Sequence, residues 1–155
     1  MDDRLAMIAL RDMLRAQLVD PLTQYSSTSR QWIHNDTILP TATFPRIQLE
    51  KIDDSRIENL SIGFKFWEKR ILPVNIWFKT KTNFKYKVDD NYLTNEEFTK
   101  YYQEEIKDII KDHGQFFHDN YRIYVKVIAI GSPVQDEESQ LYYGKVTVNI
   151  ICYET

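Results

Sequence analysis

The chain has 155 residues, 43% of them hydrophobic, with 20 basic and 23 acidic side chains and a formal net charge of −3. A chain of this length buries enough surface to fold without a disulfide or a metal, so we predict a single domain over residues 1–155. The nearly balanced charge does not indicate a general nucleic-acid binder, which is usually basic overall. Four glycines and five prolines exclude collagen-like and linker-like chains.

Cysteine content and the N-terminus indicate the cellular setting. Cys152 is the single cysteine of the sequence, which excludes an internal disulfide and zinc sites built on several thiolates. It lies in an apolar alternating segment, so we predict a buried, unreactive thiol. Residues 1–4 are acidic where a signal peptide is basic, and no segment approaches the roughly 20 apolar residues of a membrane span. We therefore expect a soluble, intracellular protein without a membrane partner.

The first predicted element is an amphipathic helix over residues 3–20. Asp2 or Asp3 can cap its start, where a negative charge is also favoured by the helix dipole. Pro21 is expected to end this helix, since proline cannot continue a helical hydrogen-bond ladder. Residues 23–31 are polar and rich in Ser and Thr, which indicates a loop.

Alternation with a period of two predicts a run of strands after this loop. Residues 44–52 form the first strand, in which Pro45 fits only at the start or on an edge. Residues 60–67 alternate as a further strand. The most regular alternation runs from Arg70 to Val88, which is too long for one strand in a small domain. We therefore expect either a break near Thr82-Asn83 or a projecting arm.

The C-terminal half predicts a second helix followed by two strands. Thr94 and Glu97 match a capping box, and Gly114 suits the end of the helix that they begin. Residues 121–130 and 142–153 alternate as two strands, expected to be antiparallel neighbours joined by an exposed loop. Because strands come in runs, we predict an α+β fold with a mainly antiparallel sheet and two principal helices packed on one face.

No catalytic or metal-binding constellation is complete in the sequence. His34, His113 and His118 are not spaced as a set of metal ligands. The sequence contains neither a G-x-S-x-G elbow nor a phosphate-binding glycine loop. We therefore predict no catalytic residue, no cofactor, no metal and no enzymatic activity. A small enzyme whose site is assembled from distant residues remains an alternative.

Four lysines share one parity of the long alternating stretch, namely Lys79, Lys81, Lys85 and Lys87. They can form a nucleic-acid surface, a solvated sheet face that deters edge pairing, or a contact with an acidic neighbouring subunit. The aromatic residues that interleave with these lysines, Phe78, Phe84 and Tyr86, have the opposite parity and are expected in the core. The solvated face is therefore the favoured interpretation of the lysines by themselves.

The order of these elements resembles that of the tail terminator, or tail completion, proteins of long-tailed viruses of bacteria and archaea. The resemblance rests on the first helix with its polar loop and on the strand that opens Phe44-Pro45-Arg46-Ile47. It rests further on the segment Ile71-Leu72-Pro73-Val74-Asn75-Ile76-Trp77-Phe78 ahead of the capped helix, and on the two closing strands. It covers most of the chain but includes no diagnostic motif.

The resemblance implies a structural virion protein that forms a homohexameric ring at the head-proximal end of the tail tube. Such a ring ends tube polymerisation and joins the tail to the neck. Its implied partners are other copies of itself, the tail tube protein, and neck or connector proteins, while DNA passes through the lumen without specific binding. On this reading the four lysines lie at the subunit interface, and the acidic run Asp136, Glu137 and Glu138 lines the lumen.

Two other functions remain open alongside the enzyme alternative. One is a head–neck connector or adaptor protein elsewhere in the virion. The other is a small nucleic-acid-binding module that uses the lysine face 79–87. Strongly salt-dependent binding to single strands is the property that would favour the module.

Overall fold

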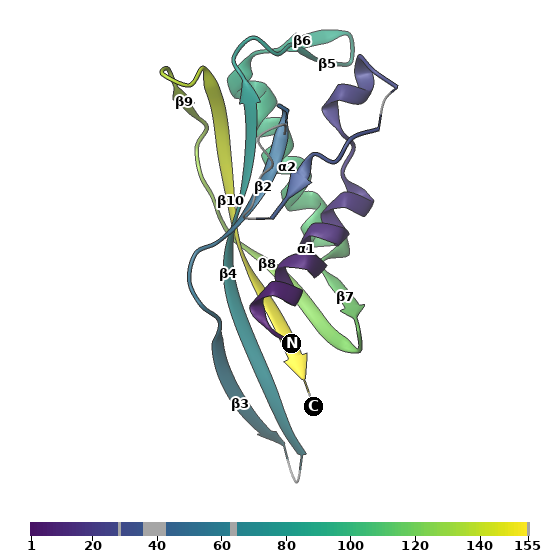
Figure 1. Cartoon of the computed structure of the whole chain (residues 1–155), viewed down its shortest axis with the longest axis vertical. Helices are drawn as coiled ribbons and strands as arrows, with labels where there is room; N and C mark the ends of the chain where they lie inside the picture. Colours follow the sequence, from purple (N-terminus) through teal and green to yellow (C-terminus); the bar gives the residue numbers. More distant parts are fainter. Residues whose placement is uncertain (28, 36–42, 63–64, 155) are drawn as a thin grey trace.

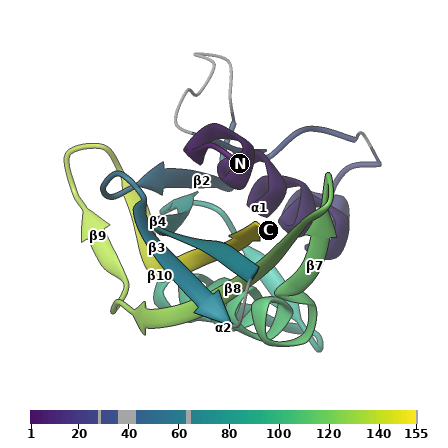
Figure 2. The same cartoon turned by 90° about the horizontal axis from the view of Figure 1, so that it is seen from below.

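The computed structural model describes residues 1–27, 29–35, 43–62 and 65–154. In these ranges the elements are α1 (Asp3–Gln17), the 3-10 helix η1 (Pro21–Gln24), β1 (Ile33–His34), β2 (Arg46–Lys51), β3 (Arg56–Ile62), β4 (Lys65–Lys81), β5 (Tyr86–Val88), β6 (Asn91–Leu93), α2 (Asn95–His113), β7 (Gln115–His118), β8 (Tyr121–Ile130), β9 (Val134–Asp136) and β10 (Leu141–Glu154). The fold is α+β, with two α-helices among the described residues and a mostly antiparallel sheet that curls (Figures 1 and 2). This confirms the predicted fold class at that level.

Strand β4 organises the main sheet, whose order is β1-β2-β4-β10-β8-β7. Its 17 residues pair with β10 along one side, from Glu68 opposite Glu154 to Lys81 opposite Leu141. Along the other side it pairs first with β3 and then with β2. The β3–β4 hairpin consequently extends past the rest of the molecule at the end where both termini lie (Figure 1).

The core is built from alternate residues of the long strands. The buried residues of β4 are Leu72, Val74, Ile76, Phe78 and Thr80, all 0% exposed. On β10 the matching positions are Val146, Val148, Ile150 and Cys152. Helices α1 and α2 contact each other, and both contact β10. The predicted parity of β4 is therefore confirmed, because burial alternates along it as an amphipathic strand requires.

Helix α1 begins where predicted but ends earlier. The Asp2 carboxylate accepts a hydrogen bond from the Leu5 backbone N–H at 2.8 Å. The helix ends at Gln17 because Leu18 has an extended backbone, with ψ of 139°. Pro21 therefore does not end α1 but begins η1, a position where its missing N–H costs nothing. The extended residues before it agree with the bias that proline imposes on its neighbour.

Helix α2 confirms the capping box and gives the reason for its terminal glycine. The Thr94 hydroxyl accepts from the Glu97 backbone N–H, and the Glu97 carboxylate accepts from the Thr94 N–H. Gly114 has a φ of −74°, so no left-handed conformation requires glycine here. Instead, a Cβ at Gly114 would lie 2.3 Å from the backbone oxygen of Ile110 and 2.9 Å from that of Val125. The helix end is therefore fixed by close approach to β8.

Two strand predictions need correction. The predicted strand over residues 60–67 is wrong, because β3 ends at Ile62 and β4 begins at Lys65, and Leu60 is paired with Trp67 in antiparallel strands. The loop predicted between the last two strands contains β9, which pairs with β10. The break predicted near Thr82-Asn83 is confirmed, since β4 ends at Lys81 and a turn follows. The projecting arm is the β3–β4 hairpin, not the lysine-rich end of the stretch.

Candidate functional site

The pairing of the strands shows which residues share a face of the main sheet. One face carries the buried residues of the strands. The opposite face, which carries the residues that alternate with them, is called the outer face. The pairing of β2, β3, β7, β8, β9 and β10 with one another and with β4 identifies its members. Its basic residues are Arg46, Arg56, Lys69, Lys79, Lys81, Arg122, Lys126 and Lys145. Its acidic residues are Glu50, Glu58 and Asp136. The outer face is therefore predominantly cationic.

Aromatic rings are interleaved with these cations. The Lys145 Nζ lies 5.6 Å and the Lys79 Nζ 6.0 Å from the ring centroid of Trp77. Tyr143 meets Trp77 edge-on, with ring centroids 5.7 Å apart. These contacts fix the lysines above a hydrophobic ring, as expected for cation–π pairs.

A second cation–aromatic group lies beside the first. The Arg46 guanidinium is 4.2 Å from the centroid of the Phe44 ring, and the Lys81 Nζ is 5.7 Å from it. Arg46 is directly opposite Lys79 in the ladder between β2 and β4. The cations of the two groups therefore lie next to one another on adjacent strands.

Burial and charge repulsion act together on Lys79. Its pKa is lowered, first because burial disfavours the ammonium form and second because Arg46 repels it, while Glu50 opposes the shift. The Lys79 Nζ donates a hydrogen bond to Gln48 Oε1 at 3.0 Å, which is a neutral partner. An anion placed here would relieve this repulsion.

The outer face also contains an apolar pocket towards the projecting hairpin. Its volume is about 230 Å³, and it is lined by Leu60, Trp67, Arg122, Tyr124 and Tyr153. Tyr124 and Tyr153 meet edge-on with centroids 5.6 Å apart, and the Arg122 guanidinium lies 5.5 Å from the Tyr124 ring. Strands β3, β4, β8 and β10 all contribute to it.

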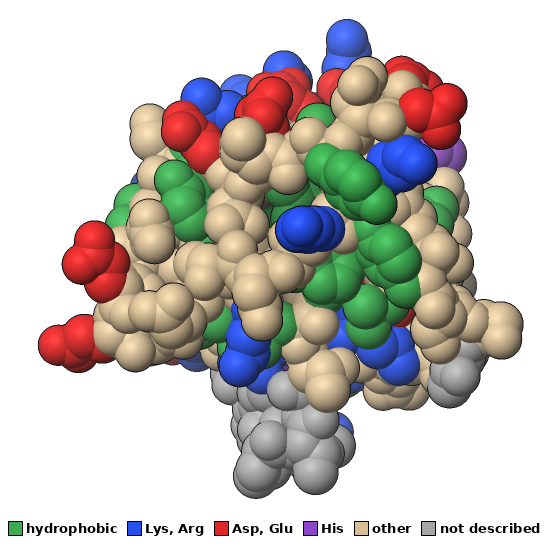
Figure 3. Space-filling view, turned by 90° about the horizontal axis from the view of Figure 1, so that it is seen from above, with side chains coloured by type: hydrophobic (Ala, Val, Ile, Leu, Met, Phe, Trp, Pro, Cys, Tyr) green, Lys and Arg blue, Asp and Glu red, His purple; other side chains and the backbone are tan. Residues whose placement is uncertain are grey.

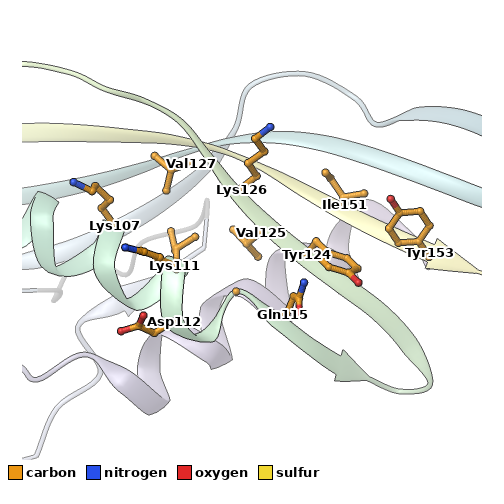
Figure 4. A pocket seen from close by; sticks show the side chains of 12 residues that line it. Lys107, Lys111, Asp112, Gln115, Tyr124, Val125, Lys126, Val127, Ile151 and Tyr153 are labelled. Atoms are coloured by element: carbon orange, nitrogen blue, oxygen red, sulfur yellow. The ribbon is translucent and has the colours of Figure 1, made fainter.

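A larger groove of about 650 Å³ adjoins this pocket at the C-terminal end of α2 (Figure 4). Lys107 and Lys111 reach it from α2, Lys126 from β8, and Tyr153 from β10. The groove follows β8, which pairs with β7 only from Tyr121 to Tyr124. Beyond that stretch the Val125 backbone N–H still donates to the Gly114 oxygen at 2.8 Å, and among the described residues the rest of β8 is paired on the β10 side alone.

The four predicted interface lysines do not share one sheet. Lys79 and Lys81 lie on the outer face, Lys85 lies between β4 and β5, and Lys87 is on β5. Lys87 lies 3.8 Å from Asp90 and 5.6 Å from the Tyr92 ring centroid. The structure therefore does not bring the four lysines together as one stripe.

The end of the molecule that carries β5 and β6 is apolar at its centre (Figure 3). Phe84 and Tyr86 stack on Phe98 of α2, with centroids 5.5 and 4.7 Å apart, which confirms that these aromatics pack inward. Tyr25 and Tyr92 remain 52% and 62% exposed. Basic and acidic side chains surround this apolar centre (Figure 3).

The acidic run lies in a tight turn between β9 and β10. Glu137 and Glu138 are exposed. The Asp136 carboxylate accepts from the backbone N–H groups of Glu138 and Ser139, and hydrogen bonding to Ser139 lowers its pKa. The local role of Asp136 is thus to hold the turn. Whether the run faces a lumen stays a prediction, since it depends on neighbouring copies.

Reactive groups elsewhere are few. Within the described ranges, no three His, Cys, Asp or Glu side chains are grouped to hold a metal ion. Cys152 is 3% exposed, and burial raises its pKa to about 11, as expected for the predicted unreactive thiol. In the same ranges no helix combines the length and apolar character needed to cross a membrane.

Sequence reasoning missed most of the outer face. It identified Lys79 and Lys81 but not Arg46, Lys145 or Arg122, which come from other strands. In its own strand, each of these residues alternates with buried residues. This alternation was the signal in the sequence that its side chain lies on the outer face. Their association depends on strand register, which one sequence does not specify.

Comparison with known proteins gives one structural similarity to report. The sequence matches no protein-family profile, and it matches no curated protein. A chain of a solved structure described as "Virion of native gene transfer agent (GTA) particle" is similar, with a TM-score of 0.49 and 6% sequence identity. The match covers 94% of this chain and 92% of that chain. The functional proposals below therefore depend on the residues of this chain.

Proposed function

We propose that the chain is a structural virion protein that assembles into a ring at the head-proximal end of a tail tube. In this role it ends tube polymerisation and joins the tail to the neck. The resemblance in element order suggested this function, and the arrangement of free strand edges supports it. The proposed partners are further copies of the chain within the ring, the tail tube protein, and a neck or connector protein.

The observation that carries the proposal is the exposed edge of the projecting hairpin. Among the described residues β3 pairs with β4 alone, so its other edge presents unpaired backbone groups. Two apolar side chains, Ile57 and Leu60, are 49% and 37% exposed on this strand. An edge of this kind favours pairing with another chain, and natural monomers usually protect it with charge, proline or a cover.

Within the described ranges, a second strand edge without a partner lies on the other side of the same sheet. It is the part of β8 beyond Lys126, where Ile128 and Ile130 are 52% and 39% exposed. The two edges differ in sequence and position, so a contact between them is head-to-tail. Contacts of that type close into a ring when the rotation per subunit allows it. Six copies are the number that the resemblance implies.

The assembly state of the purified chain tests the ring. Native mass spectrometry and negative-stain electron microscopy are expected to show a closed hexamer. Ile57→Lys places a charge on the β3 edge and should leave monomers. Val19→Lys changes an apolar residue that is 67% exposed away from the hairpin, and it should leave the ring intact. A monomeric wild-type chain, or equal behaviour of both variants, would refute the proposed edge contact.

Particles assembled without this chain test the role in the tail. Overlong tail tubes that are not attached to heads are expected, because tube growth then has no stop and the joint is missing. Tails of normal length on intact particles would exclude the terminator role. Tubes of normal length that fail to join heads would instead identify a head–neck connector.

A further inference from the structure

We propose that the outer face of the sheet binds duplex DNA through its phosphate groups, without reading the base sequence. This site differs from the lysine stretch 79–87, because it joins residues of β2, β4, β8 and β10. It does not depend on ring formation. The proposal rests on the distribution of charge, on the lack of ion pairs at five of the cations among the described residues, and on how the aromatic rings are used.

Charge is strongly segregated in this chain. Among the residues whose side chains the structure describes, the outer face has eight basic and three acidic residues. The whole sequence has 20 basic and 23 acidic residues, so basic residues are in excess on this face although acidic residues are in excess in the chain. A chain of net charge −3 therefore concentrates positive charge on one surface. Such a surface is the electrostatic complement of a polyanion, and the local pattern matters more here than the total.

Most cations of the outer face are not neutralised by a carboxylate of the protein. Among the described residues, five form no ion pair within 4.0 Å, namely Lys79, Lys81, Arg122, Lys126 and Lys145. Other lysines of the chain do have such partners. Lys100 lies 3.1 Å from Glu96, and Lys107 lies 3.0 Å from Glu104. Neutralisation by the protein itself is thus common on the helices and absent at these five positions.

The cations are also spread over a length that suits a continuous polyanion. Lys126 on β8 is opposite Asn149 on β10, and Asn149 is in turn opposite Pro73 on β4. Lys79 lies six residues further along β4, roughly 20 Å away at strand spacing. DNA carries one charge per about 1.7 Å of helix axis, so one duplex can reach both positions. A short acidic peptide segment would reach the cations at only one of these two positions at a time.

The aromatic residues favour duplex over single-stranded DNA. Base stacking needs an open ring face. The Trp77 ring is approached by Lys79 and Lys145 and meets Tyr143 edge-on. Tyr124 is likewise approached by Arg122 and packed against another tyrosine. These rings hold the cations in place for phosphates and are not presented to bases.

Fluorescence anisotropy with a labelled duplex of mixed sequence, and with one of its strands alone, tests the proposal in the full chain. The wild-type chain should bind the duplex more tightly, with affinity falling steeply between about 50 and 200 mM salt. The triple variant Lys79→Gln, Lys81→Gln, Lys145→Gln should bind at least about tenfold more weakly. Its plot of log affinity against log salt should have a slope smaller by about 3.

The control variant removes the same charge from elsewhere, as Lys85→Gln, Lys87→Gln, Lys100→Gln. It should bind like the wild type, and circular dichroism melts should show that both variants fold. The proposal is overturned by a wild type that does not bind, by tighter binding to the single strand, or by equal losses in both variants. It is also overturned if the outer-face variant changes only the mass of the assembly, since the face would then contact protein.

Discussion

Gln103 on α2 and Gly144 on β10 lie so close that a Cβ on Gly144 would be 2.6 Å from Gln103 Cδ. The Gln103 amide nitrogen donates to the backbone oxygens of Gly131 and Lys145, at 2.7 and 3.0 Å. Gln103 is 2% exposed, so these bonds satisfy a buried polar group. Helix α2 is thereby bonded to the point where the chain leaves β8 and to the β10 backbone beside it.

Gly144→Ala is expected to lower the free energy of unfolding by about 1–3 kcal/mol. The added methyl would overlap Gln103 and the Thr99 side chain, 2.7 Å away, in a closely packed site. Urea denaturation followed by circular dichroism measures the change. Gly131→Ala is the control, since its Cβ would meet nothing nearer than 3.7 Å and should cost less than about 1 kcal/mol. Equal effects would contradict the packing account.

Thr94→Ala should destabilise the fold by about 1 kcal/mol, because the Glu97 N–H loses its acceptor. Thr94→Ser keeps a hydroxyl at the cap and should retain most of that stability. Thermal melts of the three proteins provide the comparison. A serine variant as unstable as the alanine variant would show that the threonine methyl, not the cap, is responsible.

Arg30→Met should cost about 3 kcal/mol, because it leaves the Asp20 carboxylate without its bidentate partner. The Arg30 Nε and a terminal nitrogen donate to the two Asp20 oxygens at 2.8 and 2.9 Å, and the two side chains are 16% and 11% exposed. Arg11→Met is the matched control, since the Arg11–Asp12 pair is more exposed and should contribute less than about 1 kcal/mol. Chemical denaturation of both variants distinguishes these outcomes.

Stability should fall at alkaline pH partly because of Cys152. Burial raises its pKa to about 11 from 9.0, so the unfolded chain loses this proton first. The contribution is complete below pH 9 and is lost as pH rises to about 11, by roughly 2–3 kcal/mol. Denaturation at several pH values should show a shallower alkaline loss in Cys152→Ala than in the wild type. Parallel curves for the two proteins would contradict a buried, neutral thiol.

Local signals in the sequence predicted the elements whose structure they determine. The Thr94–Glu97 capping box and the alternation of β4 were both correct, because hydrogen bonding at a cap and burial along a strand depend on near neighbours. The end of α1 was predicted three residues too late. Proline marked the start of a new turn there, and no residue in the sequence marked the change to extended backbone at Leu18.

Non-local features could not be predicted in the same way. The sequence keeps a period of two from residue 60 to residue 67, so periodicity alone predicts one strand where Leu60 and Trp67 are paired in two antiparallel strands. The outer face joins Arg46, Lys79 and Lys145 from three strands, and only the pairing register places them together. A one-residue slip in that register would move every such side chain to the opposite face.

The length of β4 has a mechanical consequence. The strand runs from the projecting hairpin through the whole sheet and is paired with β10 at 14 successive positions. A pull on the hairpin along the strand direction loads these hydrogen bonds together in shear, so they resist as a group instead of opening one after another. A load applied to the projecting part of β4 is therefore carried directly into the folded body.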